Sequence, residues 1–177
     1  MLEKTEGQFT DVLNRRAKNL AKPIAELEAQ LAQVSLLEFS MLGQRYAVSL
    51  ESVLAVTRVL EITPIPLVPK HITGIIRRRG DSIALVSLPY FFNASRGGIS
   101  DADFAVIVQV KGKRFALQVE EIIGVTALAV DSLKPPQDNF DPTQISYISK
   151  VTLDGLMVVS LDALIDAEGF VVEKYSN

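Results

Sequence analysis

The chain contains the same kind of segment twice. GQRYAVSLESVLAVT, which begins at Gly43, resembles GKRFALQVEEIIGVT, which begins at Gly112. When the two are aligned, an Arg, an Ala, a Glu and a Val-Thr pair recur at the same positions. A second matching pair follows in the same order, with ALVSL from Ala84 and MVVSL from Met157. Because one unit occurs twice, the fold must be built from two similar structural units.

Both repeats have the pattern of β-structure. Short segments rich in β-branched and aromatic residues are separated by Gly, Asn, Asp and Pro, which is typical of strands joined by turns. These segments are LLEFS, RYAVSL, SIALVSL, FAVIVQV, RFALQV and LMVVSL. The Gly turns in MLGQRY and VKGKRF predict hairpins, and PYFF and DALI predict a short helix in each half. A unit of about 60 residues buries little surface alone, so we expect two lobes, about 36–92 and about 103–166, with a shared core.

Residues 10–34 have a helical period instead. Apolar residues alternately four and three positions apart form one seam: Leu13, Ala17, Leu20, Ile24, Leu27, Leu31 and Val34. Strands cannot place such a set on one face, because their side chains alternate with period two. We therefore expect a helical extension over 1–35, kinked or broken at Pro23, before a β domain over 36–177. The seam can pack on the β domain, on a partner helix or on a second copy of the chain, and about three heptads are too few to decide.

Composition excludes several kinds of site. The chain has no Cys and one His, which excludes a disulfide framework, a thiol nucleophile and a metal site of several His or Cys ligands. A hydrophobic content of 48% is enough for a packed core. No apolar segment reaches the roughly 20 residues that span a bilayer, and MLEKTEGQFTD lacks the apolar core of a signal peptide. We expect a cytoplasmic protein that needs no cofactor.

No catalytic motif is evident. His71 lies in VPKHITG, with no Ser in a nucleophile context nearby, and we expect it in a loop or at the surface. Carboxylates are scattered, and Glu120 and Glu121 are adjacent in sequence instead of facing each other. We expect a non-enzymatic protein. A small hydrolase is kept as an alternative, which predicts a deep pocket with raised carboxylate pKa values.

One stretch is strongly basic. Between residues 58 and 80, Glu61 is the sole anion and the cations are Arg58, Lys70, Arg77, Arg78 and Arg79. The prolines of ITPIPLVPK predict an extended segment over the surface, and RRRGDS predicts a turn between two strands. Arginines suit an acidic protein surface, because the planar guanidinium binds carboxylates bidentately. The alternatives are a solvated hairpin tip and a nucleic-acid surface at Arg77–Arg79, although the net charge is −3 and no aromatic platform accompanies the arginines.

The segment VLAVTRVLEITPIPLVPKHITGIIRRRGDSIALVSL resembles the central part of the CheW family. That family has a Val-rich strand, a Pro-containing loop, a strand opened by Gly, and a turn with Arg-Gly. RFALQVEEIIGVTAL followed by LKPP is similar to the second lobe, so the resemblance covers about 36–166. It implies a mainly β fold of two intertwined, five-stranded SH3-like barrels. It also implies a scaffold that joins the regulatory domain of a CheA-type histidine kinase to the cytoplasmic tip of chemoreceptors, in chemotaxis or a related pathway such as pilus motility.

The resemblance also implies a receptor-facing site. The positions that match it are Val56, Gly74, Arg79 and Gly80. The residues that would set its charge are Arg58, Arg77 and Arg78. Three positions depart from the family pattern: Arg77–Arg78 replace Asn-Leu, Ser87 replaces Asp, and Arg58 stands where an acidic residue is common. We expect these changes to alter the partner contact.

Overall fold

The computed structural model describes residues 32–93, 104–137, 140–168 and 170. The expected helical extension over 1–35 lies outside this part of the chain up to residue 31. The strands are β1 (Gln33–Met41), β2 (Gln44–Ser49), β3 (Val53–Arg58), β4 (Ile72–Arg78), β5 (Asp81–Ser87), β6 (Phe104–Val110), β7 (Lys113–Val119), β8 (Glu121–Ala129), β9 (Ile148–Val151) and β10 (Met157–Val159). The helices are α2 (Leu88–Phe91), α3 (Pro142–Ile145) and α4 (Leu161–Ile165), with 3-10 turns η1 (Leu50–Ser52) and η2 (Val130–Ser132).

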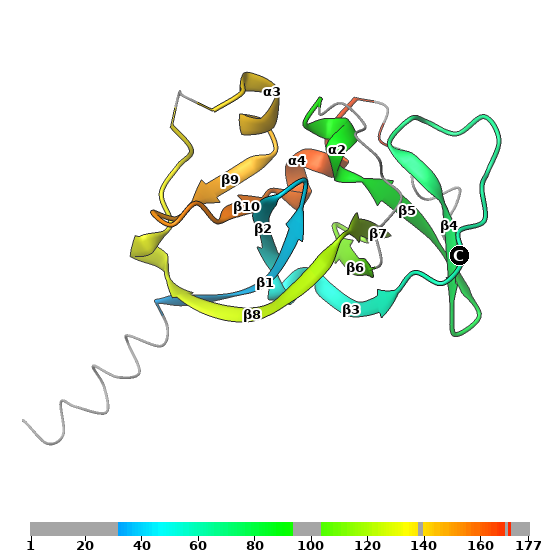
Figure 1. Cartoon of the computed structure of the whole chain (residues 1–177), viewed down its shortest axis with the longest axis horizontal. Helices are drawn as coiled ribbons and strands as arrows, with labels where there is room; N and C mark the ends of the chain where they lie inside the picture. The colour runs from blue at the N-terminus through cyan, green and yellow to red at the C-terminus, as the bar shows by residue number, and fades with distance from the viewer. Residues whose placement is uncertain (1–31, 94–103, 138–139, 169, 171–177) are drawn as a thin grey trace, which may run out of the picture.

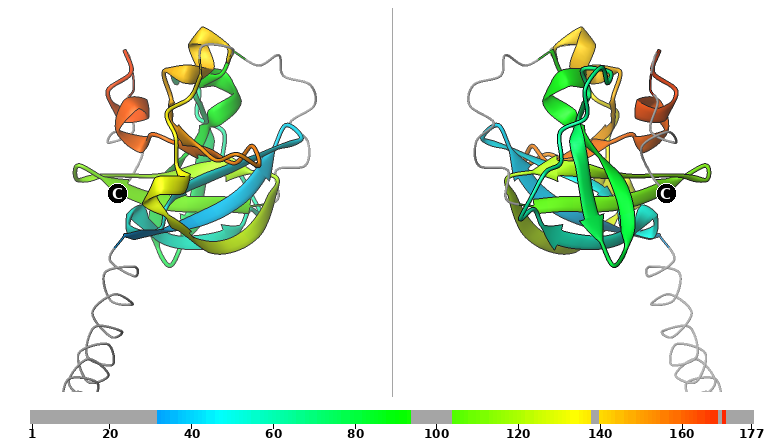
Figure 2. Two further views of the ribbon diagram at one scale, coloured as in Figure 1. Left: turned by 90° about the vertical axis from the view of Figure 1, so that its left-hand side faces the viewer. Right: turned by 90° about the vertical axis from the view of Figure 1, so that its right-hand side faces the viewer.

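The strands form two five-stranded sheets, and each sheet combines both repeats. The strand orders are β8-β1-β2-β10-β9 and β3-β6-β7-β5-β4. The first two strands of either repeat therefore join the last three strands of the other. This exchange confirms the intertwined fold, and it means that the segments 36–92 and 103–166 do not correspond to one sheet each. The helices lie together on one side of the sheets, opposite β3 and β8 (Figures 1 and 2).

The two sheets repeat each other in detail. β2 pairs in parallel with β10, and β7 pairs in parallel with β5. An isolated bridge joins Thr63 to Ile75 in one sheet, and Lys134 to Val151 in the other. Because equivalent positions carry the same kind of side chain, the duplicated sequence reproduces the same pairing twice.

Tight Gly turns close three hairpins. The turn residues are Leu42–Gly43, Arg79–Gly80 and Lys111–Gly112, and all six have positive φ, between 48° and 91°. Two positive-φ residues between paired strands define a type I′ turn, whose twist matches that of a hairpin. The hairpins predicted at MLGQRY and VKGKRF, and the turn predicted at RRRGDS, are thus confirmed.

The core has a shared layer and a separate centre for each sheet. Leu37 and Val86 belong to the large shared cluster, whereas their neighbours Leu36 and Leu85 belong to the centres of the two sheets. Adjacent side chains of a strand point to opposite faces, and here both faces are buried. This explains why these strands are continuous apolar runs instead of alternating ones.

The structure corrects three expectations. Val34 lies in β1, so the helical seam does not continue to that residue. His71 is 3% exposed, and its ring lies 5.2 Å from that of Phe170 and 5.6 Å from that of Phe91. His71 does lie in a turn, just before β4, but it is not at the surface, because these aromatic rings cover it. The segment after Ile62 is not extended throughout, because it turns at Leu67, where φ is 59°.

Candidate partner-binding site

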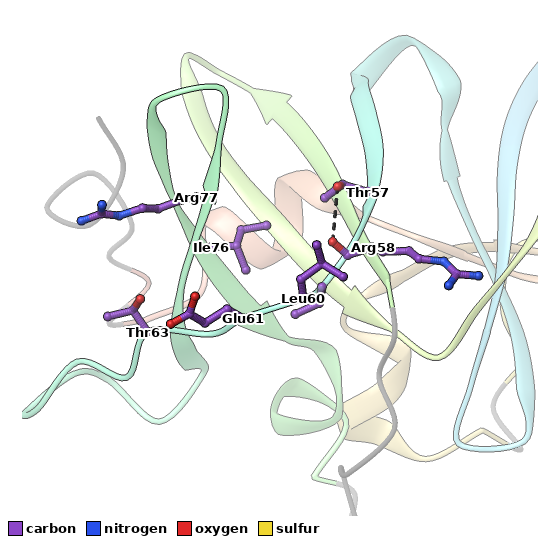
Figure 3. Close-up of a pocket in the computed structure, with 8 residues that line it drawn as sticks. Thr57, Arg58, Leu60, Glu61, Thr63, Ile76 and Arg77 are labelled. Atoms are coloured by element: carbon purple, nitrogen blue, oxygen red, sulfur yellow. Dashed lines mark hydrogen bonds between the residues drawn. The ribbon is translucent and has the colours of Figure 1, made fainter.

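A groove of about 290 Å³ lies between the end of β3, the segment that follows it, and β4. The residues that line it are Thr57, Arg58, Val59, Leu60, Glu61, Thr63, Ile76 and Arg77. In Figure 3, Leu60 and Ile76 lie between the two arginines, whose side chains extend to opposite sides. Leu60 is 91% exposed. An apolar side chain left in water beside cations is typical of a surface that a protein partner covers.

Gly74 allows one wall of this groove to form. The segment after β3 lies across β4, where Thr63 and Ile75 exchange two backbone hydrogen bonds of 2.9 Å each. A Cβ on residue 74 would lie 2.5 Å from Ile62 Cγ2 and 2.7 Å from the Thr63 carbonyl oxygen. No side chain fits in that space. Gly74 is buried, and its role is to let the segment at Ile62 and Thr63 lie close to β4.

The tip of the β4–β5 hairpin carries excess positive charge. Arg77 and Arg79 are exposed, and Arg78 is half-buried. Among the described residues, the ion pairs involve none of these three arginines. The nearby Asp81 carboxylate accepts a hydrogen bond from Arg114 Nη1 at 3.0 Å instead. The tip therefore has cationic groups available to a partner.

Among the described residues, this basic tip occurs in one of the two repeats. The equivalent hairpin of the other repeat, β9–β10, lacks it. Eight residues separate Ile75 from Ala84, whereas five separate the equivalent Val151 and Met157. The additional residues lengthen the β4–β5 hairpin, and the arginines lie at its end. The duplication therefore does not produce a second copy of this feature.

Val56 and Arg58 lie on the outward face of β3. Val56 is 37% exposed and its neighbour on that face, Leu54, is 53% exposed. The Arg58 guanidinium lies 5.6 Å from the centroid of the Phe104 ring, a cation–π distance. This contact holds the cation beside the groove.

The predicted residues thus occupy different places on β3 and on the β4–β5 hairpin. Arg58 and Arg77 line the groove, and Gly74 is beneath its wall. The residues at the hairpin tip are Arg78, Arg79 and Gly80. Sequence reasoning missed Leu60 and Ile76, because an apolar residue gives no sign of whether it will be exposed at a groove or buried below it.

Two observations on the described residues bear on the hydrolase alternative. They contain no cluster of three or more His, Cys, Asp or Glu that could hold a metal ion. The pKa of the Asp154 carboxyl is lowered by a hydrogen bond from Thr152 and by Arg45, the direction opposite to that expected of a catalytic acid.

No helix in the described part of the chain is long and apolar enough to cross a bilayer.

A model of the CheW-like domain matches residues 35–168. The chain belongs to the CheW-like family. A curated relative, a chemotaxis protein CheW from Treponema pallidum (strain Nichols), is 22% identical over 143 residues, which is 77% of this chain and 84% of that protein. The crystal structure of the scaffolding protein TtCheW from Thermoanaerobacter tengcongensis matches with a TM-score of 0.69 and 23% identity, covering 79% of this chain and 99% of that one. The CheW-like fold predicted from the sequence is therefore confirmed.

Proposed function

We propose that this CheW-like protein is a non-enzymatic adaptor that couples chemoreceptors to a CheA-type histidine kinase. The observation that carries the proposal is the CheW-like domain over residues 35–168. The relatives named above are a chemotaxis protein and a scaffolding protein, which agrees with this role. A kinase regulatory domain and the cytoplasmic tip of a receptor are the two partners, and both place the protein in the cytoplasm.

The receptor-facing site in this proposal is the groove and the arginine tip. Its residues are Val56, Arg58, Gly74, Arg77, Arg78, Arg79 and Gly80. Exposed apolar side chains on β3 and at Leu60 offer contact area, and the arginines offer charge. Such a combination of apolar area and arginine is typical of protein interfaces.

The charge of the site predicts an acidic partner surface. The arginines at the tip have no internal carboxylate partner among the described residues, and each can bind a carboxylate through two parallel hydrogen bonds. The receptor tip that binds here should therefore present Asp or Glu opposite the hairpin. Charge complementarity of this kind selects partners and accelerates association more than it adds affinity.

The direct test measures binding of the purified chain to a receptor signalling-tip fragment and to a kinase regulatory domain by calorimetry. The double substitution Arg77→Glu and Arg79→Glu should weaken receptor binding by at least about tenfold, because it replaces two attractive charges with repulsive ones. Lys150→Glu is the matched control, since Lys150 is exposed on β9 of the other sheet, and it should bind as the unmodified chain does.

The possible results test the adaptor role and the location of the binding site separately. Binding of both partners with no effect of the arginine substitutions would refute the site and leave the adaptor role. Binding of neither partner would refute the adaptor role. Nucleic-acid binding that falls steeply with salt would support the alternative use of Arg77–Arg79.

A further inference from the structure

A strip of apolar side chains is exposed along the outward face of β8. Ile123 is 49% exposed, Val125 61%, and Val130, just after the strand, 51%. Ala127 and Ala129 continue the strip between them. The strand β8 lies on the side of the molecule opposite the helices (Figures 1 and 2). A continuous strip of this kind, on an edge strand, is a surface that another element is expected to cover.

The N-terminal segment enters the β domain at one end of this strip. The Ala32 carbonyl oxygen accepts a hydrogen bond of 2.8 Å from the Val130 backbone N–H, and Gln33 pairs with Ala129. Ala32 itself is in a turn. The 31 residues that precede it, which lie outside the described part of the chain, are therefore tethered directly beside Val130.

The length and pattern of that segment fit the strip. The seam from Leu13 to Leu31 would span about 27 Å as a helix that continues past Pro23 with a kink. The segment from Glu121 to Val130 spans about 30 Å at the rise of a strand, and the apolar strip begins at Ile123 within it. The seam also presents apolar residues on one face only, which is the pattern of a helix that covers a surface and leaves its other face in water.

The charges favour the same placement. Cations gather toward the first half of the seam, at Arg15, Arg16 and Lys18. If the end of the segment is held at Val130, this half reaches the opposite end of the strip. The exposed carboxylates Glu120 and Glu121 lie there.

We propose that residues 13–31 form an amphipathic helix that lies on the β8 strip of the same chain. The helix runs in the same direction as β8, and the chain turns at Ala32 to enter β1. The tether explains why the segment of the same chain occupies the strip in place of a second copy, because a short connection gives an effective concentration on the order of millimolar.

If the helix covers the strip on β8, the two faces related by the repeat differ in their exposure to solvent. Ile123 and Val125 of β8 are the repeat counterparts of Leu54 and Val56 on β3. With the strip on β8 covered, the face on β3 stays open to a partner. The inference does not rest on the proposed function, since it concerns the other sheet.

A cross-linking experiment on the full chain tests the placement. The chain has no native Cys, so a short bifunctional thiol reagent reacts only at introduced positions. The pair Leu20→Cys and Val125→Cys should give a cross-linked monomer, formed about a hundredfold faster than an intermolecular product at ~10 µM protein. Two control pairs should give little product. In Lys22→Cys with Val125→Cys, the first cysteine lies outside the apolar seam. In Leu20→Cys with Val56→Cys, the second cysteine lies on the related face of β3.

Fluorescence gives a second, independent measurement. The chain has no Trp, so Val125→Trp reports on this strip alone. Changing Leu20 and Leu27 to Glu in that variant should shift its emission to longer wavelength, because water would reach the ring. The same changes should leave Val56→Trp unaffected. Cross-linked dimers, or a Trp signal that depends on protein concentration, would mean that a second copy covers the strip and would overturn the proposal. Equal cross-linking in all pairs would also overturn it, because the segment would then have no specific position.

Discussion

At the scale of single residues, the two repeats differ at one position that is a buried charge in the first and apolar in the second. Glu38 of β1 occupies the position that Ile107 has in β6, and Glu38 is 7% exposed. Arg45 donates a hydrogen bond to it at 2.6 Å and another to Asp154 at 2.9 Å. A buried carboxylate is tolerated only when its charge is paired. The arginine is therefore structural here, and it joins two strands of the first repeat to the second.

The repeat supplies a matched pair of substitutions at this position. Arg45→Ala should lower the free energy of unfolding by about 1–3 kcal/mol, because it leaves the buried Glu38 carboxylate without its partner. Arg114 is the repeat counterpart of Arg45 and pairs with the half-exposed Asp81. Arg114→Ala should cost at most about 1 kcal/mol. Urea unfolding of both variants gives the comparison, and equal losses would contradict a special role for Glu38.

Asp154 predicts part of the acid sensitivity of the fold. Hydrogen bonds from Thr152 and from Arg45 lower the pKa of its carboxyl. Because the pKa is lower in the folded state, this group stabilises the fold above its unfolded pKa of about 3.9, and that contribution is lost as pH falls through the folded pKa. Asp154→Asn should therefore reduce stability at pH 7 and flatten the acid limb of the stability curve. The effect should be small, since the side chain is 64% exposed and screened by water. An unchanged acid limb would show that the interaction contributes nothing.

At the scale of elements, the groove depends on how one segment crosses one strand. The segment from Ile62 to Thr63 lies against β4 because residue 74 has no side chain. The β-bulge between Ile72 and Gly74 marks the same place. A backbone approach of this closeness is a known reason for a Gly within a strand.

Gly74→Ala should displace the wall of the groove. The added methyl overlaps Ile62 and the Thr63 carbonyl, which should cost about 1–3 kcal/mol and speed hydrogen exchange at the Thr63 and Ile75 amides. Gly124 is the control, because its φ of 152° is close to the 158° of Gly74, while a Cβ on residue 124 would meet nothing within 4 Å. If Gly124→Ala were equally disruptive, backbone conformation and not the close approach would be the cause.

At the scale of the whole molecule, neither repeat can complete a sheet. β3 pairs with β6 and β8 pairs with β1, so both exchanges join strands of different repeats. The shared cluster also takes buried residues from both halves, such as Val48 and Leu117. We therefore expect the two repeats to fold and unfold as one cooperative unit.

Dividing the chain between the repeats tests this statement. Fragments 33–93 and 104–168, prepared separately, should each lack stable structure in far-UV circular dichroism, because their edge strands and apolar faces would have no partner. Mixed together, they should regain the β signal and a cooperative thermal transition. A fragment that unfolded cooperatively by itself would show that one lobe is an independent domain.

The sequence by itself determined the local elements, because their causes are local. Gly at positive φ closes the hairpins, β-branched runs form the strands, and the duplication shows that every such element occurs twice. It also placed Arg58 and Arg77 in the same basic stretch. The roles of these residues in binding remain predictions until they are measured.

The tertiary structure alone decided which elements meet. Strand exchange, the burial of His71 against Phe170 and the ion pair of Arg45 with Asp154 each depend on residues that are distant in the sequence. A hairpin needs only its own turn, whereas the pairing of β3 with β6 needs a favourable surface from the other repeat. Non-local pairing is selected by the total area buried and by the polar groups satisfied, and neither quantity is a property of any single segment.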